Sequence, residues 1–160
     1  MLSKIKLEVL ENKKLVEYWA PYHKDATTKI DSIYNDDQFT KNFIQDKLIL
    51  FKTIFTRQTI LGRFPNNDAW DIAKSHPLIV NLDYDQLLVL SKIYNQQKST
   101  FKPIPKVSEL ILSIDFNSPE NAKLNLEKLR NYMNEINSRE LLLLEYYNEA
   151  DKILNLQNIK

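Results

Sequence analysis

Two histidines, His23 and His76, are the side chains best suited to metal binding or proton transfer, because the chain contains no cysteine. A zinc site needs three or four ligands at helical or turn spacing. Neither histidine has a second histidine four residues away. His23 could bind a metal together with acids from another helix, but an exposed or helix-capping role is the simpler interpretation. His76 precedes Pro77 at a predicted helix end, where a cation interacts favourably with the helix dipole. We expect no metal site.

The acidic residues also lack the spacing of known sites. A di-iron bundle carries a glutamate three residues before a histidine, and position 20, three residues before His23, is alanine. The pairs Asp36–Asp37 and Asp83–Asp85 lack the ligand series and the glycine of an EF-hand loop. These acids are typical of turns and helix caps.

Glycine is nearly absent: Gly62 is the single glycine in 160 residues. Glycine allows positive φ and close approach of the backbone to a ligand. The sequence therefore contains no P-loop, no dinucleotide-binding turn and no GxSxG elbow. We predict that the chain is not an enzyme and binds no organic cofactor, although an apolar ligand between helices stays open.

Aromatic residues are the remaining candidates for a binding surface. They gather in three places and are more often core than surface at helical spacing: Tyr18, Trp19 and Tyr22; Trp70, Tyr84 and Tyr94; Tyr146 and Tyr147. Tyr18 and Tyr146 lie off the main apolar stripes. They are therefore the candidate interaction surface.

Composition is that of a single globular domain. The chain has 43% hydrophobic residues, 22 basic and 21 acidic residues, and a net charge of +1. A nucleic-acid-binding protein usually has a clustered basic surface, so we expect no nucleic-acid partner. The longest apolar runs are four residues, such as 48–51 and 141–144, whereas a membrane span needs about 20.

Apolar stripes at helical spacing predict an all-α fold. A long helix is expected over 1–34, with a kink rather than a break at Pro21. Central helices are expected over 40–98: one over 40–57, a short helix capped by Asn67 or Asp68, and one opened by Asp83 and Gln86. Between the first two, a loop over 58–66 is expected to lie against the core through Ile60, Leu61 and Phe64.

The C-terminal part carries clear boundary signals. Pro103 and Pro105 predict a break, and 107–114 is ambiguous between helix and strand, with helix favoured. Ser118 followed by Pro119 predicts a helix start, and a helical region over 118–156 follows, with a discontinuity near Asn137. Together these elements predict one domain, 1–160, a bundle of five to six helices. The N-terminal helix is expected to pack antiparallel against the C-terminal one.

Residues 67–97 carry a family resemblance. A polar cap precedes Ala69-Trp70 on a short helix, Leu82-Asp83-Tyr84 stands at the next cap, and Leu90-Ser91-Lys92-Ile93-Tyr94 follows. This order resembles the soluble part of a family of uncharacterised bacterial single-span membrane proteins. The resemblance implies a long polar helix, a compact helical domain and a membrane-proximal location, without a known activity, cofactor or catalytic residue. The family's N-terminal membrane helix has no counterpart before Leu2.

Two functional interpretations follow. The first is a non-catalytic interaction or sensory module that is extracytoplasmic and is tethered to a membrane by an anchor absent from this chain. Lys4, Lys6, Lys13 and Lys14 suit a segment close to anionic headgroups. It would contact an unknown protein partner or self-associate. The alternative is a free cytoplasmic helical adaptor or regulator that starts at Met1.

Overall fold

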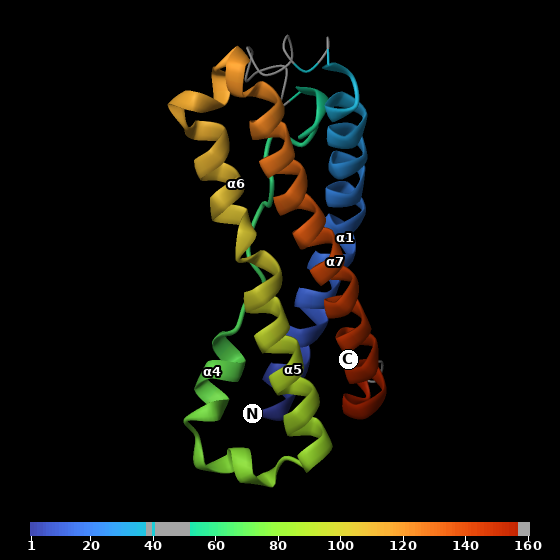
Figure 1. The fold of residues 1–160 in the computed structure, drawn as a ribbon. Coiled ribbons are helices and arrows are strands. Elements are labelled where there is room, and N and C mark those ends of the chain that lie inside the picture. The colour runs from blue at the N-terminus through green and yellow to red at the C-terminus, as the bar shows by residue number, and fades with distance from the viewer. Residues whose placement is uncertain (38–39, 41–51, 157–160) are drawn as a thin grey trace. The chain divides into compact units, whose positions relative to one another are not determined.

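The structure, a computed structural model, describes residues 1–37, 40 and 52–156. Of these residues 82% are helical and none forms a strand, which confirms the all-α prediction. The predicted number of five to six helices is not confirmed, because 41–51 lie outside the described residues. Figure 1 shows the elements, which are α1 (Leu2–Tyr34), α4 (Asp68–Lys74), the 3₁₀ helix η1 (Pro77–Asn81), α5 (Tyr84–Phe101), α6 (Pro103–Leu112), η2 (Ile114–Asn117), η3 (Pro119–Asn121) and α7 (Ala122–Leu154).

The chain divides into two compact units, and α1 and α7 contribute to both. Unit 1 contains Met1–Trp19, Phe64–Thr100 and Arg139–Lys160, and unit 2 contains Ala20–Arg63 and Phe101–Ser138. Each unit has a buried apolar core of its own. That the whole chain forms one domain stays a prediction.

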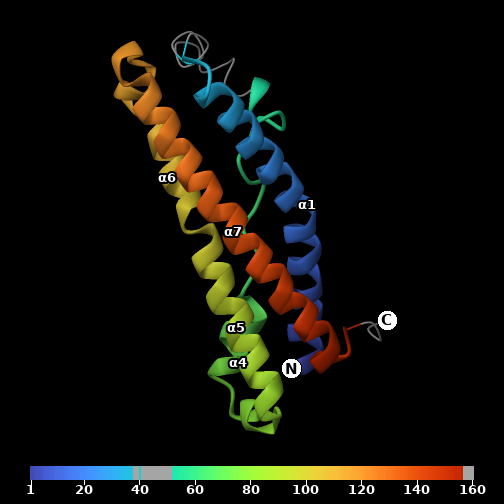
Figure 2. The same ribbon diagram turned by 45° about the vertical axis from the view of Figure 1, so that its right-hand side comes forward.

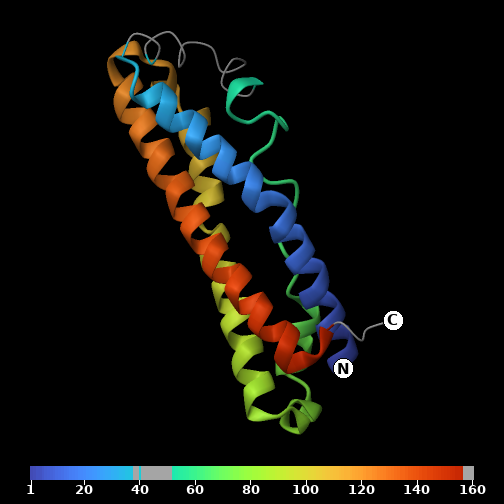
Figure 3. The ribbon, with the colours of Figure 1, turned by 90° about the vertical axis from the view of Figure 1, so that its right-hand side faces the viewer.

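In unit 1, α1, α5 and α7 surround the core. The Lys13 ammonium pairs with Asp151 and joins α1 to α7, and Figures 2 and 3 show these parts of the two helices side by side. Apolar side chains from all three helices and from α4 fill the interior: Ile5, Val9, Val16, Trp70, Ala73, Val89, Leu90, Ile93, Leu143, Ala150 and Leu154.

In unit 2, polar contacts set the register of α1 against α7. Thr27 of α1 contacts Asn137, and Asp31 of α1 contacts Arg130. Asp37, which follows the end of α1, contacts Lys123. Because the partner numbers fall as the α1 numbers rise, the helices run antiparallel. The predicted packing of the N-terminal helix against the C-terminal helix is confirmed.

Helix α1 continues through Pro21 without a break, as predicted. The kink stays a prediction. The predicted discontinuity near Asn137 is wrong, because α7 is one continuous helix. Its two polar residues have partners that leave the backbone helical: Asn137 Nδ2 donates to Thr27 Oγ1 at 2.6 Å, and Ser138 Oγ donates to the Asn134 carbonyl at 2.9 Å.

The helix boundaries near Pro103 and Pro119 agree with those predicted from the sequence. The break falls at Lys102, and α6 then begins at Pro103, so the ambiguous stretch is helical through Leu112. Pro119 opens η3, which leads directly into α7. A proline fits these first positions because it has no N–H to lose there.

The region before α4 differs from the prediction in two ways. The predicted helix over 40–57 lies mostly outside the described residues, and its described end stops at Thr53 rather than Arg57. In the loop over 58–66, Ile60 is buried as expected, but Phe64 is 55% exposed. The carbonyl groups of Thr59 and Ile60 attach the loop to α1.

Candidate functional site

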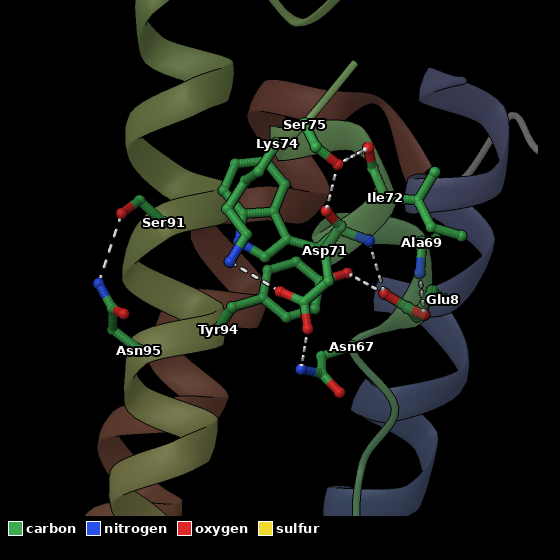
Figure 4. A network of polar contacts seen from close by, with 11 residues as sticks. Glu8, Asn67, Ala69, Asp71, Ile72, Lys74, Ser75, Ser91, Tyr94 and Asn95 are labelled. Carbon is green, nitrogen blue, oxygen red and sulfur yellow. Dashed lines mark hydrogen bonds and ion pairs between the residues drawn. The ribbon is translucent and has the colours of Figure 1, made fainter.

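The N-terminus of α4 is capped by a side chain from another helix. Asn67, at the N-cap position, makes no side-chain capping bond. Instead, the buried Glu8 carboxylate of α1 accepts the backbone N–H of Ala69 at 2.8 Å and that of Trp70 at 3.3 Å. Figure 4 shows Glu8 at this position. A negative charge here satisfies amides that have no partner within the helix and interacts favourably with its dipole.

Tyr94 of α5 completes the environment of this carboxylate. Its hydroxyl donates to Glu8 Oε1 at 2.6 Å, and its ring stacks on Trp70 with centroids 5.3 Å apart and an interplanar angle of 5°. The ammonium of Lys74 also lies 5.9 Å from the centroid of the Trp70 ring. Burial, and then the hydrogen bond to Glu8, raise the pKa of Tyr94 far above its usual range. This phenol therefore stays protonated at any physiological pH.

A second set of buried polar groups lies beside the first. Tyr147 OH donates to Gln97 Oε1 at 2.6 Å, and Asn12 Nδ2 donates to the same oxygen at 3.2 Å. Asn12 also pairs with the backbone of Asn66 in both directions, at 2.6 and 2.8 Å. Burial is the main cause that raises the pKa of Tyr147. These contacts attach α1, α5, α7 and the segment before α4 to one another.

The groups of this network are bonded to one another. The two Glu8 oxygens already accept three donors, and both phenols are held protonated. Among the described residues, no group of three or more His, Cys, Asp or Glu side chains could hold a metal ion. The network therefore fixes the position of α4 and of the chain that leaves it.

His23 is buried, so the prediction of an exposed or capping role is wrong. Its Nε2 lies 2.7 Å from the Ile60 carbonyl, and the neighbouring Tyr22 hydroxyl donates to the Thr59 carbonyl at 2.7 Å. Two adjacent α1 residues thus hold the 59–60 backbone. A buried carbonyl needs a donor, and the Tyr22 hydroxyl supplies one to Thr59.

His76 has a different capping role from the one predicted. His76 is exposed, and its Nδ1 accepts the Leu78 N–H at 3.1 Å and caps η1 rather than α4.

The aromatic predictions have mixed outcomes. Trp19, Tyr22, Trp70 and Tyr94 are buried, as expected of core residues. By contrast, Tyr84 is 77% exposed, at the first turn of α5.

The structure gives the two candidate interaction residues different neighbours. Tyr18 is 58% exposed and packs edge-on against Trp19 with centroids 5.6 Å apart. Tyr146 is half-buried, and the Lys92 ammonium of α5 lies 5.7 Å from its ring centroid.

An exposed apolar surface that the sequence analysis missed lies at η1 and the start of α5. Leu78, Val80, Tyr84 and Leu88 are 49%, 80%, 77% and 41% exposed, and η1 buries none of its residues. We call these four residues the tip surface. Tyr84 and Leu88 are spaced four residues apart and so share one side of α5. Ser91 continues that side, which faces away from α4 in Figure 4.

Unit 2 contains a cavity of about 250 Å³ between residues 58–61 and α6. Its lining is mainly apolar, with Ile60, Leu61, Ile104 and Ile111 among the residues around it. An engineered apolar cavity of roughly 150 Å³ holds benzene. The expectation that an apolar ligand could lie between helices therefore stays open.

Within the described ranges, no helix is both long enough and apolar enough to cross a membrane. No protein-family model, curated protein or solved structure matches the chain.

Proposed function

We propose that the chain is a non-catalytic protein-interaction module and that unit 1 contacts its partner through the tip surface. One observation carries the proposal: four large apolar side chains are exposed between residues 78 and 88. Single exposed apolar residues are normal, whereas a group of them is typical of an interaction site. Tyr84 adds a rigid aromatic ring with a polar tip, a residue type enriched at interfaces.

The buried network supports the same proposal. An interface gains affinity when its contact residues are already ordered before binding. Glu8 caps α4, and the Tyr94 hydroxyl of α5 donates to Glu8. In the chain, α4 precedes η1 and α5 follows it. The segment η1, which carries Leu78 and Val80, therefore connects two helices that share one anchoring carboxylate.

Two features of the proposal rest on the sequence. Tyr18 and Tyr146 are proposed as secondary contact residues, outside the tip surface. We also propose a membrane-tethered module, because the resemblance implies a membrane-proximal location and because Lys4, Lys6 and Lys14 suit an anionic surface. The alternative is a free cytoplasmic helical adaptor or regulator with the same contact surface.

Quantitative affinity isolation from the source cells tests the proposal. The tagged protein is compared with a Leu78→Ser/Val80→Ser double variant and with Leu141→Ser, a matched control that is 65% exposed on α7 of the same unit. We expect one protein, or a second copy of the chain, to be recovered equally with the wild type and the control. Its recovery with the double variant should fall by about tenfold, the effect of losing roughly 1.4 kcal/mol. Equal recovery with all three proteins contradicts the proposal.

A further inference from the structure

Acidic residues adjoin the tip surface where α5 begins. Asp83 and Asp85 stand on either side of Tyr84, and all three are exposed. Two more acids, Asp68 and Asp71, lie in the first turn of α4. Over residues 67–88 the sequence has these four acids and one base, Lys74, which gives a charge of −3 with His76 neutral.

Ion pairing and the helix dipole offset only part of this negative charge. Lys74 pairs with Asp71 at 2.7 Å, and the Asp83 N–H is bound by Gln86 at 3.4 Å. A helix N-terminus carries about half a positive elementary charge. That partial charge offsets only a fraction of the negative charge that Asp83 and Asp85 carry at the start of α5. The tip surface thus combines exposed apolar side chains with the exposed carboxylates of Asp83 and Asp85.

This combination selects the chemistry of the partner. An acidic segment or an anionic lipid surface would bring like charges together, which is costly at an interface. A segment with apolar side chains and nearby lysine or arginine would cover Leu78 and Val80 and pair with the acids. We infer that the tip surface binds a cationic amphipathic segment of a protein partner. This inference rests on the proposed function and names the class of its partner.

A pair of synthetic peptides tests the inference. Both form amphipathic helices with the same leucine pattern, and the polar positions are lysine in one and glutamate in the other. Fluorescence anisotropy of each labelled peptide measures its Kd for the whole chain. At low salt, we expect the lysine peptide to bind at least about tenfold more tightly, and this ratio should shrink as salt screens the charges.

Three variants locate the binding. Leu78→Ser/Val80→Ser should weaken binding of the lysine peptide by about tenfold, because the apolar contact is lost. Asp83→Asn/Asp85→Asn should bring the ratio between the two peptides towards one. Leu141→Ser should bind as the wild type does. All the changed side chains are exposed, and circular dichroism with urea unfolding checks that each variant is folded.

The outcomes separate this inference from the proposed function. Equal affinity for both peptides, lost in the Leu78→Ser/Val80→Ser variant, overturns the charge preference and leaves the proposed contact surface intact. Binding that is unchanged in that variant overturns both. Failure of the lysine peptide to bind overturns the inference. Binding to phosphatidylglycerol vesicles that depends on Leu78 and Val80 overturns it as well, in favour of a lipid surface.

Discussion

The phenol of Tyr94 donates a buried 2.6 Å hydrogen bond to the carboxylate of Glu8, which in turn caps α4. Residues 86 positions apart in the sequence are thereby joined at the point where α4 begins. Because α4 has only seven residues, its intrinsic stability is small and it depends on tertiary contacts. The position of η1, and of the tip surface with it, therefore depends on this pair.

Replacing Glu8 by glutamine should destabilise the protein. A glutamine side chain has one acceptor oxygen, so it cannot serve Ala69 N–H, Trp70 N–H and Tyr94 OH together. Hydrogen bonds to a charged group contribute more than neutral ones, and we expect a loss of about 2 kcal/mol in the free energy of unfolding. Urea unfolding followed by circular dichroism measures it. Glu11→Gln, at an exposed position of α1, is the control, and an equal loss in both variants contradicts the assigned role.

Removing the Tyr94 hydroxyl tests the same pair from the other side. Tyr94→Phe keeps the ring that stacks on Trp70 and removes only the donor to Glu8. We expect a loss of roughly 1.5–2 kcal/mol. In a double-mutant cycle, Tyr94→Phe and Glu8→Gln should be non-additive because they share one contact. Additive losses would show that the two side chains do not act together.

Stability should fall at high pH because of two buried phenols. Burial is the largest cause that raises the pKa of Tyr94 and of Tyr147 in the folded state, whereas unfolded tyrosine has a pKa of about 10. The folded state thus holds these protons more tightly. The stabilisation is complete below a pH of about 10 and is lost progressively above it. Urea midpoints measured across this range should decline less in Tyr94→Phe and Tyr147→Phe. A wild-type midpoint that stays constant contradicts the prediction.

The backbone at Gln58 offers a test of the loop that precedes Phe64. Gln58 has a φ of 57°, in the left-handed region that favours glycine. A β-branched residue is least tolerated there. We expect Gln58→Val to cost about 1–2 kcal/mol and Gln58→Gly to be neutral or stabilising. Thermal unfolding compares them, and equal midpoints would show that this conformation is not maintained in solution.

Local sequence signals predicted the helices well. The apolar stripe through Trp19, Tyr22 and Ala26 does lie in the core, and Pro103 and Pro119 do mark helix starts. Such signals act over one or two turns, so they are readable without knowledge of the fold. The prediction of a discontinuity near Asn137 was wrong because the hydrogen-bond partner of Asn137 is Thr27, which lies on another helix.

The site depended on contacts between distant parts of the sequence, which no local pattern contains. Glu8 stands between Leu7 and Val9, and nothing near it in the sequence shows that it is buried and caps α4. His23 likewise has its partner at Ile60, in a loop without helical periodicity. The tip surface was missed for a related reason. Leu78 and Val80 are apolar, and only the fold shows that a 3₁₀ turn leaves them exposed.

The most direct measurement of the central claim is site-specific photo-crosslinking in the source cells. A photoreactive amino acid replaces Val80 in one strain and Leu141, the exposed control on α7, in another. The account predicts a discrete crosslinked product from position 80 that disappears when Leu78 is changed to serine, and none from position 141. Crosslinks from both positions in equal yield, or from position 141 alone, would contradict the claim that the tip surface contacts the partner.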